Sequence, residues 1–206
     1  MNKDTFLSQI SEGAEALGIH LNSLAKDRLF LYYSELERWN RKINLVSRQQ
    51  HDWIAMHFLD SLVPLGLGLV KPGSRVVDLG AGAGFPGMPL KIAGEGIFLG
   101  MAEASGKKCA WLRHLARVLK IDGAQVLDGR FEDLVNNGWA GFFDLAVSRA
   151  AAKPHKVLDL AHPFLTSGGR VLVYTTEALI EKDLGKVHPY KVQGSKVPSV
   201  IWEVTI

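Results

Sequence analysis

The stretch VVDLGAGAGFPG, Val76–Gly87, decides the fold. Two β-branched residues and an acid lead into a glycine run, which is typical of a buried strand that ends in a ligand-binding loop. Read from Gly82, the stretch matches G-x-G-x-x-G through Gly84 and Gly87, the pattern of a dinucleotide site. Read from Asp78, it is D-x-G-x-G-x-G, the loop that more often holds S-adenosylmethionine. The glycines alone leave both cofactors open.

Strand patterns and helix patterns alternate on the C-terminal side of this loop. We expect strands over residues 75–80, 97–103, 124–129, 143–150 and 168–176, and helices over residues 86–94, 106–120, 131–137 and 153–165. Such alternation predicts an α/β fold with a Rossmann-like, doubly wound parallel sheet. The last two β-rich segments, which end in SVIWEVTI, have no helix between them. They predict an antiparallel hairpin at the sheet edge.

The segment before Pro72 has the periodicity of helices instead. Helical spacing on one face relates Phe6, Ile10, Ala14 and Leu17, and a longer helix contains Leu24, Leu31, Leu36 and Trp39. A third helix is expected over Asp52–Leu62. We therefore predict an N-terminal helical extension, residues 1–72, followed by a Rossmann-like domain, residues 73–206.

Composition bounds the class of protein. The 206 residues are 47% hydrophobic and 22% charged, as in an ordinary globular chain, and the formal charge of +3 permits a polyanionic partner without requiring one. The apolar stretch Leu62–Val70 is too short for a membrane helix and contains Pro64. A lone cysteine, Cys109, excludes an intramolecular disulfide and a cysteine-cluster metal site. We expect a monomeric, cytoplasmic protein that needs neither membrane nor metal.

Two prolines distinguish the cofactors. A pyrophosphate binds free N–H groups at a helix N-terminus, but Pro86 and Pro89 stand in the first turn after the glycines and have no N–H. Because S-adenosylmethionine has no phosphate, they favour it over a dinucleotide. Glu103 ends the second strand, where an acid meets ribose hydroxyls in either case. Asp78 is placed to anchor the loop or the cofactor's ammonium group. A glycine run that only turns the chain is the remaining alternative.

The sequence lacks motifs that two classes of methyltransferase need, and this limits the possible acceptors of the methyl group. Methylation at C5 of a pyrimidine needs a cysteine nucleophile, yet Cys109 falls within an amphipathic helix and is expected to be a packing residue. Exocyclic-amine methyltransferases carry an Asn/Asp-Pro-Pro-aromatic loop after the fourth strand, where this chain has SRAAAKPH, Ser148–His155. A ring nitrogen with its own lone pair, such as N7 of guanine, requires only positioning.

Six motifs then match one family in order and spacing. They are WNRKINL (39–45), HFLDSL (57–62), DLGAGAGFPGMPL (78–90), EASGKK (103–108), GRFED (129–133) and SRA (148–150). The sequence resembles the RsmG (GidB) ribosomal RNA small-subunit methyltransferases, which methylate guanine N7 with S-adenosylmethionine. The resemblance implies a class I S-adenosylmethionine-dependent methyltransferase that acts on 16S ribosomal RNA.

The resemblance also implies roles for individual residues. The cofactor-binding set that it implies is Asp78, Gly80, Gly82, Gly84, Phe85, Glu103, Phe131, Glu132 and Arg149. Within that set Phe131 would pack by the adenine and Glu132 would anchor it. Arg149 would position cofactor and substrate, the alternative being a salt bridge to Asp144 or Glu132. The RNA-binding set is Arg38, Arg41, Lys42 and His57, with Arg48 nearby. A structural role for His57 stays open, and Trp39 is expected to pack between helices.

Two features depart from the family. The family often has Lys-Gly just after the fifth strand, where this chain has Tyr174-Thr175-Thr176, and the segment from Gly185 matches weakly. Alternative functions are therefore a non-catalytic S-adenosylmethionine- or RNA-binding module, a methyltransferase with a diverged acceptor, or a small-molecule methyltransferase. The basic N-terminal helices argue against the last of these.

Overall fold

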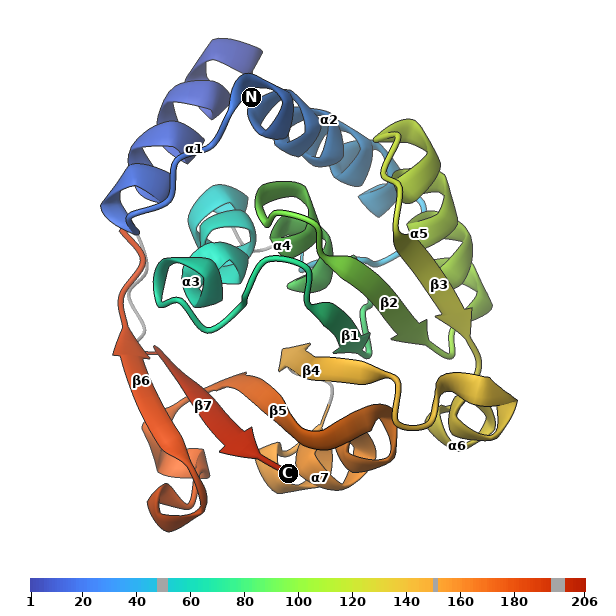
Figure 1. Ribbon diagram of the computed structural model, residues 1–206. Helices are drawn as coiled ribbons and strands as arrows, with labels where there is room; N and C mark the ends of the chain where they lie inside the picture. The colour runs from blue at the N-terminus through green and yellow to red at the C-terminus, as the bar shows by residue number, and fades with distance from the viewer. Residues whose placement is uncertain (48–51, 150–151, 194–198) are drawn as a thin grey trace.

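The computed structural model describes residues 1–47, 52–149, 152–193 and 199–206. Within them the strands form one sheet in the order β3-β2-β1-β4-β5-β7-β6 (Figure 1). The strands are β1 Arg75–Leu79, β2 Phe98–Glu103, β3 Ala124–Asp128, β4 Phe143–Arg149, β5 Leu165–Thr175, β6 Lys186–Tyr190 and β7 Ser199–Thr205. The first five are parallel, and β7 runs antiparallel between β5 and β6. The predicted α/β sheet with its antiparallel edge hairpin is confirmed.

Helices cover both faces of the sheet. They are α1 Lys3–Ala16, α2 Ser23–Asn40, η1 Ile54–Leu59, α3 Asp60–Gly66, α4 Gly87–Ala93, α5 Gly106–Val118, α6 Phe131–Leu134 and α7 Pro154–Ala161, with the short turns η2 Val135–Trp139, η3 His162–Phe164, η4 Glu177–Leu179 and η5 Lys182–Leu184. Figure 1 shows α1 to α5 on one side of the sheet and α6 and α7 on the other. Alternate residues of β5 follow this division: Leu172 packs with the first group, and Val171 and Val173 with the second.

The N-terminal helices pack directly on the glycine loop. Phe6 of α1 meets Phe58 of η1 edge to face at 5.7 Å, and Tyr32 of α2 stacks on Phe85 of the loop at 5.0 Å. All four rings belong to one buried cluster that also includes Val76 of β1. The helices therefore fix the position of the loop. The division of the chain near Pro72 stays a prediction.

Two details of the helical segment differ from expectation. Leu24 and Leu31 lie on α2 as predicted but are 58% and 38% exposed, because the buried stripe of α2 instead runs through Leu29, Tyr32 and Leu36. The third helical stretch runs on to Gly66, four residues beyond the predicted Leu62. No helix in the described part of the chain combines the length and hydropathy needed to cross a bilayer.

Candidate active site

The glycine loop leaves β1 at the centre of the sheet. The chain order reverses there, because β2 lies on one side of β1 and β4 on the other. Ligands of open α/β sheets bind at the carboxyl ends of the strands at such a reversal. Gly80, Gly82 and Gly84 all have positive φ, at 73°, 55° and 101°. Glycine adopts these angles without the strain that a side chain would bring.

Asp78 anchors the loop from behind. Its side chain is fully buried, and Oδ2 accepts a hydrogen bond of 2.8 Å from the N–H of Gly87, the first residue of α4. Oδ1 is buried with no hydrogen-bond partner among the described residues. Burial raises the pKa of Asp78 to about 7, against the opposing effect of the Gly87 N–H. Asp78 therefore ties the end of β1 to the start of α4.

The glycines of the pattern differ in what surrounds them. A Cβ on Gly82 would approach only the Gly80 carbonyl, at 3.6 Å, so this backbone faces open space. A Cβ on Gly84 would lie 2.8 Å from the Tyr32 hydroxyl, and one on Gly87 would lie 2.7 Å from Asp78 Oδ2. Gly82 thus leaves room for a ligand, while Gly84 and Gly87 let the protein pack against itself.

Glu103, at the end of β2, holds the outer side of the loop. Its Oε2 accepts from the N–H of Gly82 and its Oε1 from the N–H of Ser105, both at 2.9 Å. A carboxylate has about four acceptor positions, so two remain for other donors such as ribose hydroxyls. The residue that the sequence assigns to the ribose therefore also supports the loop.

A cavity of about 570 Å³ opens above these elements, within the size range of small-molecule sites. Its lining comes from residues 45–46 and 55–60, the glycine loop, Lys108, Arg149 and the ends of β5, β6 and β7. Asp60 is the one carboxylate among the lining residues of the described chain. The cavity takes in Gly80, Gly82 and Phe85 of the predicted cofactor set.

Arg149 projects into this cavity from the end of β4. Its Nη1 donates to the Met56 carbonyl at 3.0 Å and to Asp60 Oδ2 at 3.1 Å. Its guanidinium carbon lies 5.2 Å from the centre of the Phe85 ring, a cation–π distance. The alternative of a salt bridge to Asp144 or Glu132 is wrong in its partner, because the acid that Arg149 meets is Asp60.

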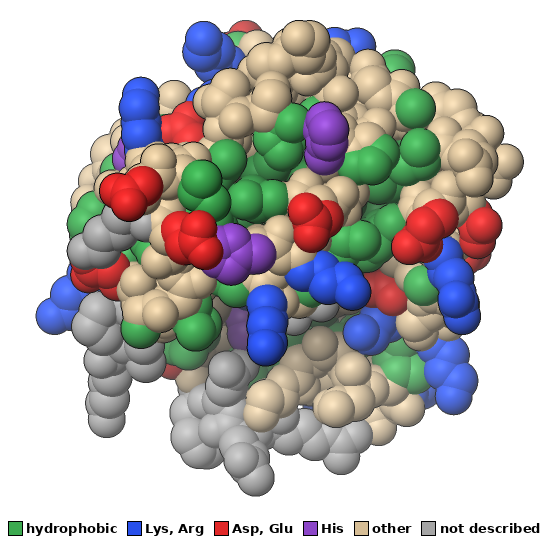
Figure 2. Space-filling model, turned by 90° about the horizontal axis from the view of Figure 1, so that it is seen from below, with side chains coloured by type: hydrophobic (Ala, Val, Ile, Leu, Met, Phe, Trp, Pro, Cys, Tyr) green, Lys and Arg blue, Asp and Glu red, His purple; other side chains and the backbone are tan. Residues whose placement is uncertain are grey.

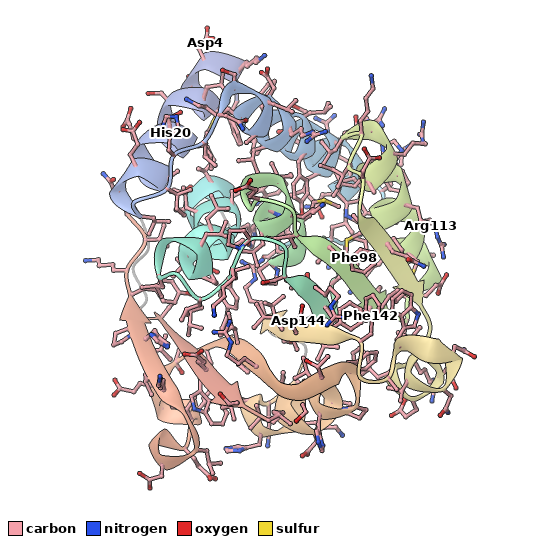
Figure 3. All side chains as sticks on the ribbon, viewed as in Figure 1. Asp4, His20, Phe98, Arg113, Phe142 and Asp144 are labelled. Carbon is pink, nitrogen blue, oxygen red and sulfur yellow. The ribbon has the colours of Figure 1, made fainter. Side chains whose placement is uncertain are left out.

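The two expected acids lie elsewhere. Asp144 stands at the opposite end of β4, beside Phe142 and Phe98 in Figure 3, and pairs with Arg75 at 2.5 Å. Glu132 is exposed on α6. Arg149, the last residue of β4, therefore pairs with an acid of α3 rather than with an acid of its own strand.

His57 is a neutral residue in this arrangement. Arg149 Nη2 lies 3.2 Å from His57 Nδ1, and because a guanidinium can only donate, Nδ1 accepts and Nε2 carries the proton. Burial and then the charge of Arg149 lower the pKa of His57 to about 3. The ring stacks on Phe85 at 5.1 Å. His57 therefore adds no positive charge for RNA, and its contact with RNA stays a prediction.

The other predicted RNA-binding residues lie on the surface at the end of α2. Arg38 pairs with Glu35 at 2.5 Å, and Arg41 and Lys42 are exposed. Arg48 is outside the described residues. On the face shown in Figure 2, basic, acidic and histidine side chains are interspersed. Positive charge is thus distributed among acids on that face rather than gathered into one continuous patch.

Asn40, the last residue of α2, shapes the chain that leads from the end of this helix to the cavity. Its Oδ1 accepts from the N–H groups of Leu45 and Val46, at 2.8 and 3.0 Å, and its Nδ2 donates to the Val46 carbonyl at 3.1 Å. The side chain thereby bends the chain after α2 so that Leu45 and Val46 line the cavity. Trp39 packs on Trp111 and His114, at 5.6 and 4.9 Å, as the sequence predicts.

Four residues lie apart from the cavity, and the sequence singles out three of them, Phe131, Glu132 and Cys109. Phe131 meets Phe164 edge to face, and neither Phe131 nor Glu132 lines the cavity. Arg113, on the outer side of α5 in Figure 3, pairs with Asp128 at 2.8 Å. Cys109 is buried, and that burial raises the pKa of its thiol to about 11, which fits a packing residue. No group of potential metal ligands occurs among the described residues.

Comparison with known proteins agrees with this geometry. The family model described as rRNA small subunit methyltransferase G matches residues 25–200. A protein of Caldanaerobacter subterraneus subsp. tengcongensis, named ribosomal RNA small subunit methyltransferase G, is 37% identical over 92% of this chain and 78% of its own length. A protein of the same name from Dictyoglomus thermophilum is 36% identical over 84% of this chain and 73% of its own. The chain belongs to this methyltransferase family.

Solved structures show the same fold at low sequence identity. A precorrin-6y C5,15-methyltransferase of Geobacter metallireducens superposes with a TM-score of 0.54 at 13% identity, over 79% of this chain and 90% of that one. TYW2 of M. jannaschii, in complex with AdoMet, superposes with a TM-score of 0.51 at 18% identity, over 66% of this chain and 70% of that one. The expected class I S-adenosylmethionine-dependent methyltransferase is confirmed.

The residues at the site fit S-adenosylmethionine rather than a dinucleotide. The first-turn N–H of Gly87 is bonded to Asp78 and that of Met88 to the Gly84 carbonyl, while Pro86 and Pro89 have none. A pyrophosphate would therefore find no free donor at the start of α4. Open space remains above Gly82, with Glu103 and Arg149 on either side of β1. When bound there, the cofactor supplies an electrophilic methyl group on a sulfonium.

Sequence reasoning missed the contacts that β5 and β6 make on one side of the cavity. Tyr190 of β6 donates to Asp60 Oδ1 at 2.6 Å, and Tyr174 of β5 donates to the Ser61 carbonyl at 3.0 Å. Asp60 and Ser61 lie inside the motif HFLDSL, but no local pattern relates them to tyrosines more than one hundred residues later. The tyrosine that departs from the family's Lys-Gly is thus a lining residue.

Proposed function

We propose that the chain transfers a methyl group from S-adenosylmethionine to N7 of a guanine in 16S ribosomal RNA. The observation that supports guanine N7 as the acceptor is the state of the histidine, carboxylate and thiol groups in and near the cavity. His57 is neutral with Nδ1 engaged by Arg149, Asp60 is engaged by Arg149 and Tyr190, and the Cys109 thiol is buried away from the cavity. The described lining therefore presents no cysteine nucleophile, and Arg149 contacts both its histidine and its carboxylate.

Guanine N7 suits such a site because it has a lone pair and no proton. Its lone pair forms the new bond to the methyl carbon, the sulfur–carbon bond breaks, and that electron pair remains on sulfur. No proton has to leave, so no base is needed, and alignment of N7 with the methyl group is the main requirement. The protein's contribution is to hold both partners in alignment within the cavity.

The roles of the individual residues are part of this proposal. Gly80, Gly82 and Phe85 would contact the cofactor from the loop, and Glu103 would accept its ribose hydroxyls. Phe131 and Glu132 would close its adenine end, outside the cavity described above. Arg149, a positioning residue, would orient the cofactor and the base. Its guanidinium, which lines the cavity and is held by three hydrogen bonds and by the Phe85 ring, supports that role.

The partner and its setting follow from the same reasoning. The relatives are named for the small-subunit ribosomal RNA, and a base must be turned out of its helix to enter a cavity of this kind. Arg38, Arg41 and Lys42 are exposed at the end of α2, a few residues before Leu45 and Val46 of the cavity lining, and would bind phosphates. We infer a monomer that works in the cytoplasm, consistent with its lone buried cysteine.

Purified protein with labelled S-adenosylmethionine tests the proposal. The acceptors should include small subunits that lack the modification, the naked RNA and a set of small metabolites. We expect label in the RNA, recovered as N7-methylguanosine, and strand scission by aniline after borohydride reduction at one position. Label in a pyrimidine, in an exocyclic amine or only in metabolites would contradict the proposal.

A further inference from the structure

The candidate site has two halves that lie on opposite sides of β1, and Glu103 belongs to it without lining the cavity. Glu103 ends β2 on one side, and this is the half where ribose hydroxyls are expected. On the other side stand Arg149 at the end of β4, Tyr174 at the end of β5 and Tyr190 on β6. Since the cofactor's nucleoside belongs to the Glu103 half, the acceptor base belongs to the half that contains the tyrosines.

Asp60 lies in the half of the site that is expected to hold the target base, and its carboxylate can accept further hydrogen bonds. Each carboxylate oxygen takes one hydrogen bond from the protein, Oδ1 from Tyr190 and Oδ2 from Arg149. Each oxygen therefore keeps one of its two acceptor positions. The side chain is 17% exposed and lines the cavity, where it is the one carboxylate among the described residues. Asp60 thus brings to the cavity two oxygens that are held by the protein and can each accept one further hydrogen bond.

The chemistry of guanine selects the edge that can meet this carboxylate. Arginine usually reads guanine through O6 and N7, but a donor on N7 would cover the lone pair that has to attack. N1–H and the N2 amino group are two adjacent donors on the far edge of the base. A carboxylate accepts from both at once, which leaves N7 uncovered and turned away from the carboxylate. Arg149 Nη1 is already engaged by Met56 and Asp60.

We propose that Asp60 is the specificity-determining residue for the target base. Its carboxylate accepts hydrogen bonds from N1–H and the N2 amino group of guanine and so directs N7 toward the methyl donor. Tyr190 and Arg149 hold the carboxylate in that orientation. Adenine, which presents an acceptor at N1 and has no amino group at C2, is rejected. This inference rests on the proposed function of guanine N7 methylation.

The test crosses an enzyme variant with a substrate analogue. The RNA carries either guanosine or inosine at the mapped target position, and inosine lacks only the N2 amino group. For the wild type we expect kcat/KM on inosine to fall by about tenfold to a hundredfold, the value of a good bidentate contact. In Asp60→Asn the rate on guanosine RNA should fall, because the amide nitrogen and the N2 amino group are both donors. Inosine RNA should then react no more slowly than guanosine RNA, because inosine has no amino group to oppose the amide.

A merely structural role for Asp60 would give a different result. If Asp60 only holds Arg149, Asp60→Asn lowers the rates on both RNAs by the same factor, since independent effects multiply. The matched control is Tyr190→Phe, which removes one hydrogen bond to Asp60 but keeps the carboxylate. It should lower the rate and preserve the preference for guanosine.

Three outcomes overturn the inference, and two of them need only the wild-type enzyme. A wild-type enzyme that methylates inosine RNA as fast as guanosine RNA excludes a contact with the N2 amino group. Equal loss on both RNAs in a folded Asp60→Asn, with cofactor binding retained in calorimetry, excludes the role of Asp60 while the proposed function stands. Absence of any transfer to RNA by the wild type overturns the proposed function, and the inference with it.

Discussion

The two halves of the site are built in different ways. On the cofactor side, polar groups are held by residues close in the chain: Asp78 meets Gly87 and Glu103 meets Gly82, across 9 and 21 residues. On the acceptor side, Asp60 meets Arg149 and Tyr190 across 89 and 130 residues. The first half is shaped mainly by backbone geometry, and the second by side chains from four separate segments.

This difference predicts which changes affect which function. A change in the loop should alter the space that the cofactor needs, because the proposed site brings the loop backbone against the cofactor at Gly82. A change in the acceptor cluster leaves the loop intact and alters how the base is held. Damage to the first half should abolish binding, whereas damage to the second should lower the rate with the cofactor still bound.

The largest effect is expected for Gly82→Val. Its side chain would occupy the open space above the loop, at a φ of 55° that β-branched residues avoid. Calorimetry should detect no S-adenosylmethionine binding to the variant. The wild type should bind it and ignore NAD, and at one hundred times the dissociation constant the ligand should stabilise the fold by about 2.7 kcal/mol.

Gly68→Val is the matched control for this prediction. Gly68 has a similar φ of 68°, no atom within 4 Å of the position that a Cβ would take, and no place in the cavity. Both variants should lose about 1–2 kcal/mol of stability from the left-handed backbone. Only Gly82→Val should lose the ligand. Equal affinity in the two variants would show that the space above Gly82 is not the cofactor's.

The next largest effect concerns Asp78 and pH. Its pKa is raised to about 7 in the folded state, from an ordinary value of 3.8, so the folded chain binds the proton more tightly than the unfolded chain. The stability that this contributes is fully present below about pH 4 and is lost as the pH rises through 7. The slope is at most about 1.4 kcal/mol per pH unit.

Asp78→Asn isolates this contribution. The amide oxygen can still accept from Gly87, but the side chain no longer titrates. Urea unfolding at several pH values between 4 and 7 should show the wild type losing stability relative to the variant. Parallel curves over that range would mean that Asp78 stays ionised in the folded protein.

Arg149→Ala should reduce methyl transfer at least tenfold, equivalent to ~1.4 kcal/mol of transition-state stabilisation. Because the change leaves Asp60 without its cation, stability should also fall, by about 1–3 kcal/mol. Arg75→Ala is the control, since it breaks another arginine–aspartate pair at the opposite end of the sheet. It should leave activity unchanged. An active Arg149→Ala with a lowered melting point would reject the positioning role.

The same contrast explains what could be predicted from the sequence. The strands, the edge hairpin and the glycine loop follow from local signals: apolar runs, turn residues, and prolines that remove donors. The sequence could not predict that Leu29 is buried rather than Leu31, because α2 packs on a loop that lies more than fifty residues later in the chain. Asp60 was overlooked as the partner of Arg149 for the same reason. Only the folded sheet brings the end of β4 to α3.

The smallest expected effect is at the rim, where Lys42→Ala tests RNA binding. Lys42 is exposed near the segment that lines the cavity, and a lysine that contacts one phosphate contributes about one unit to the salt dependence of binding. The variant should raise the KM for RNA a few-fold at low salt, with unchanged cofactor affinity. Lys71→Ala removes the same charge at the other end of β1, so it controls for net charge. If both variants weaken RNA binding equally, the attraction is a property of the total charge. If only Lys42→Ala does so, and its salt slope is shallower, the rim beside the acceptor half is the RNA-binding surface.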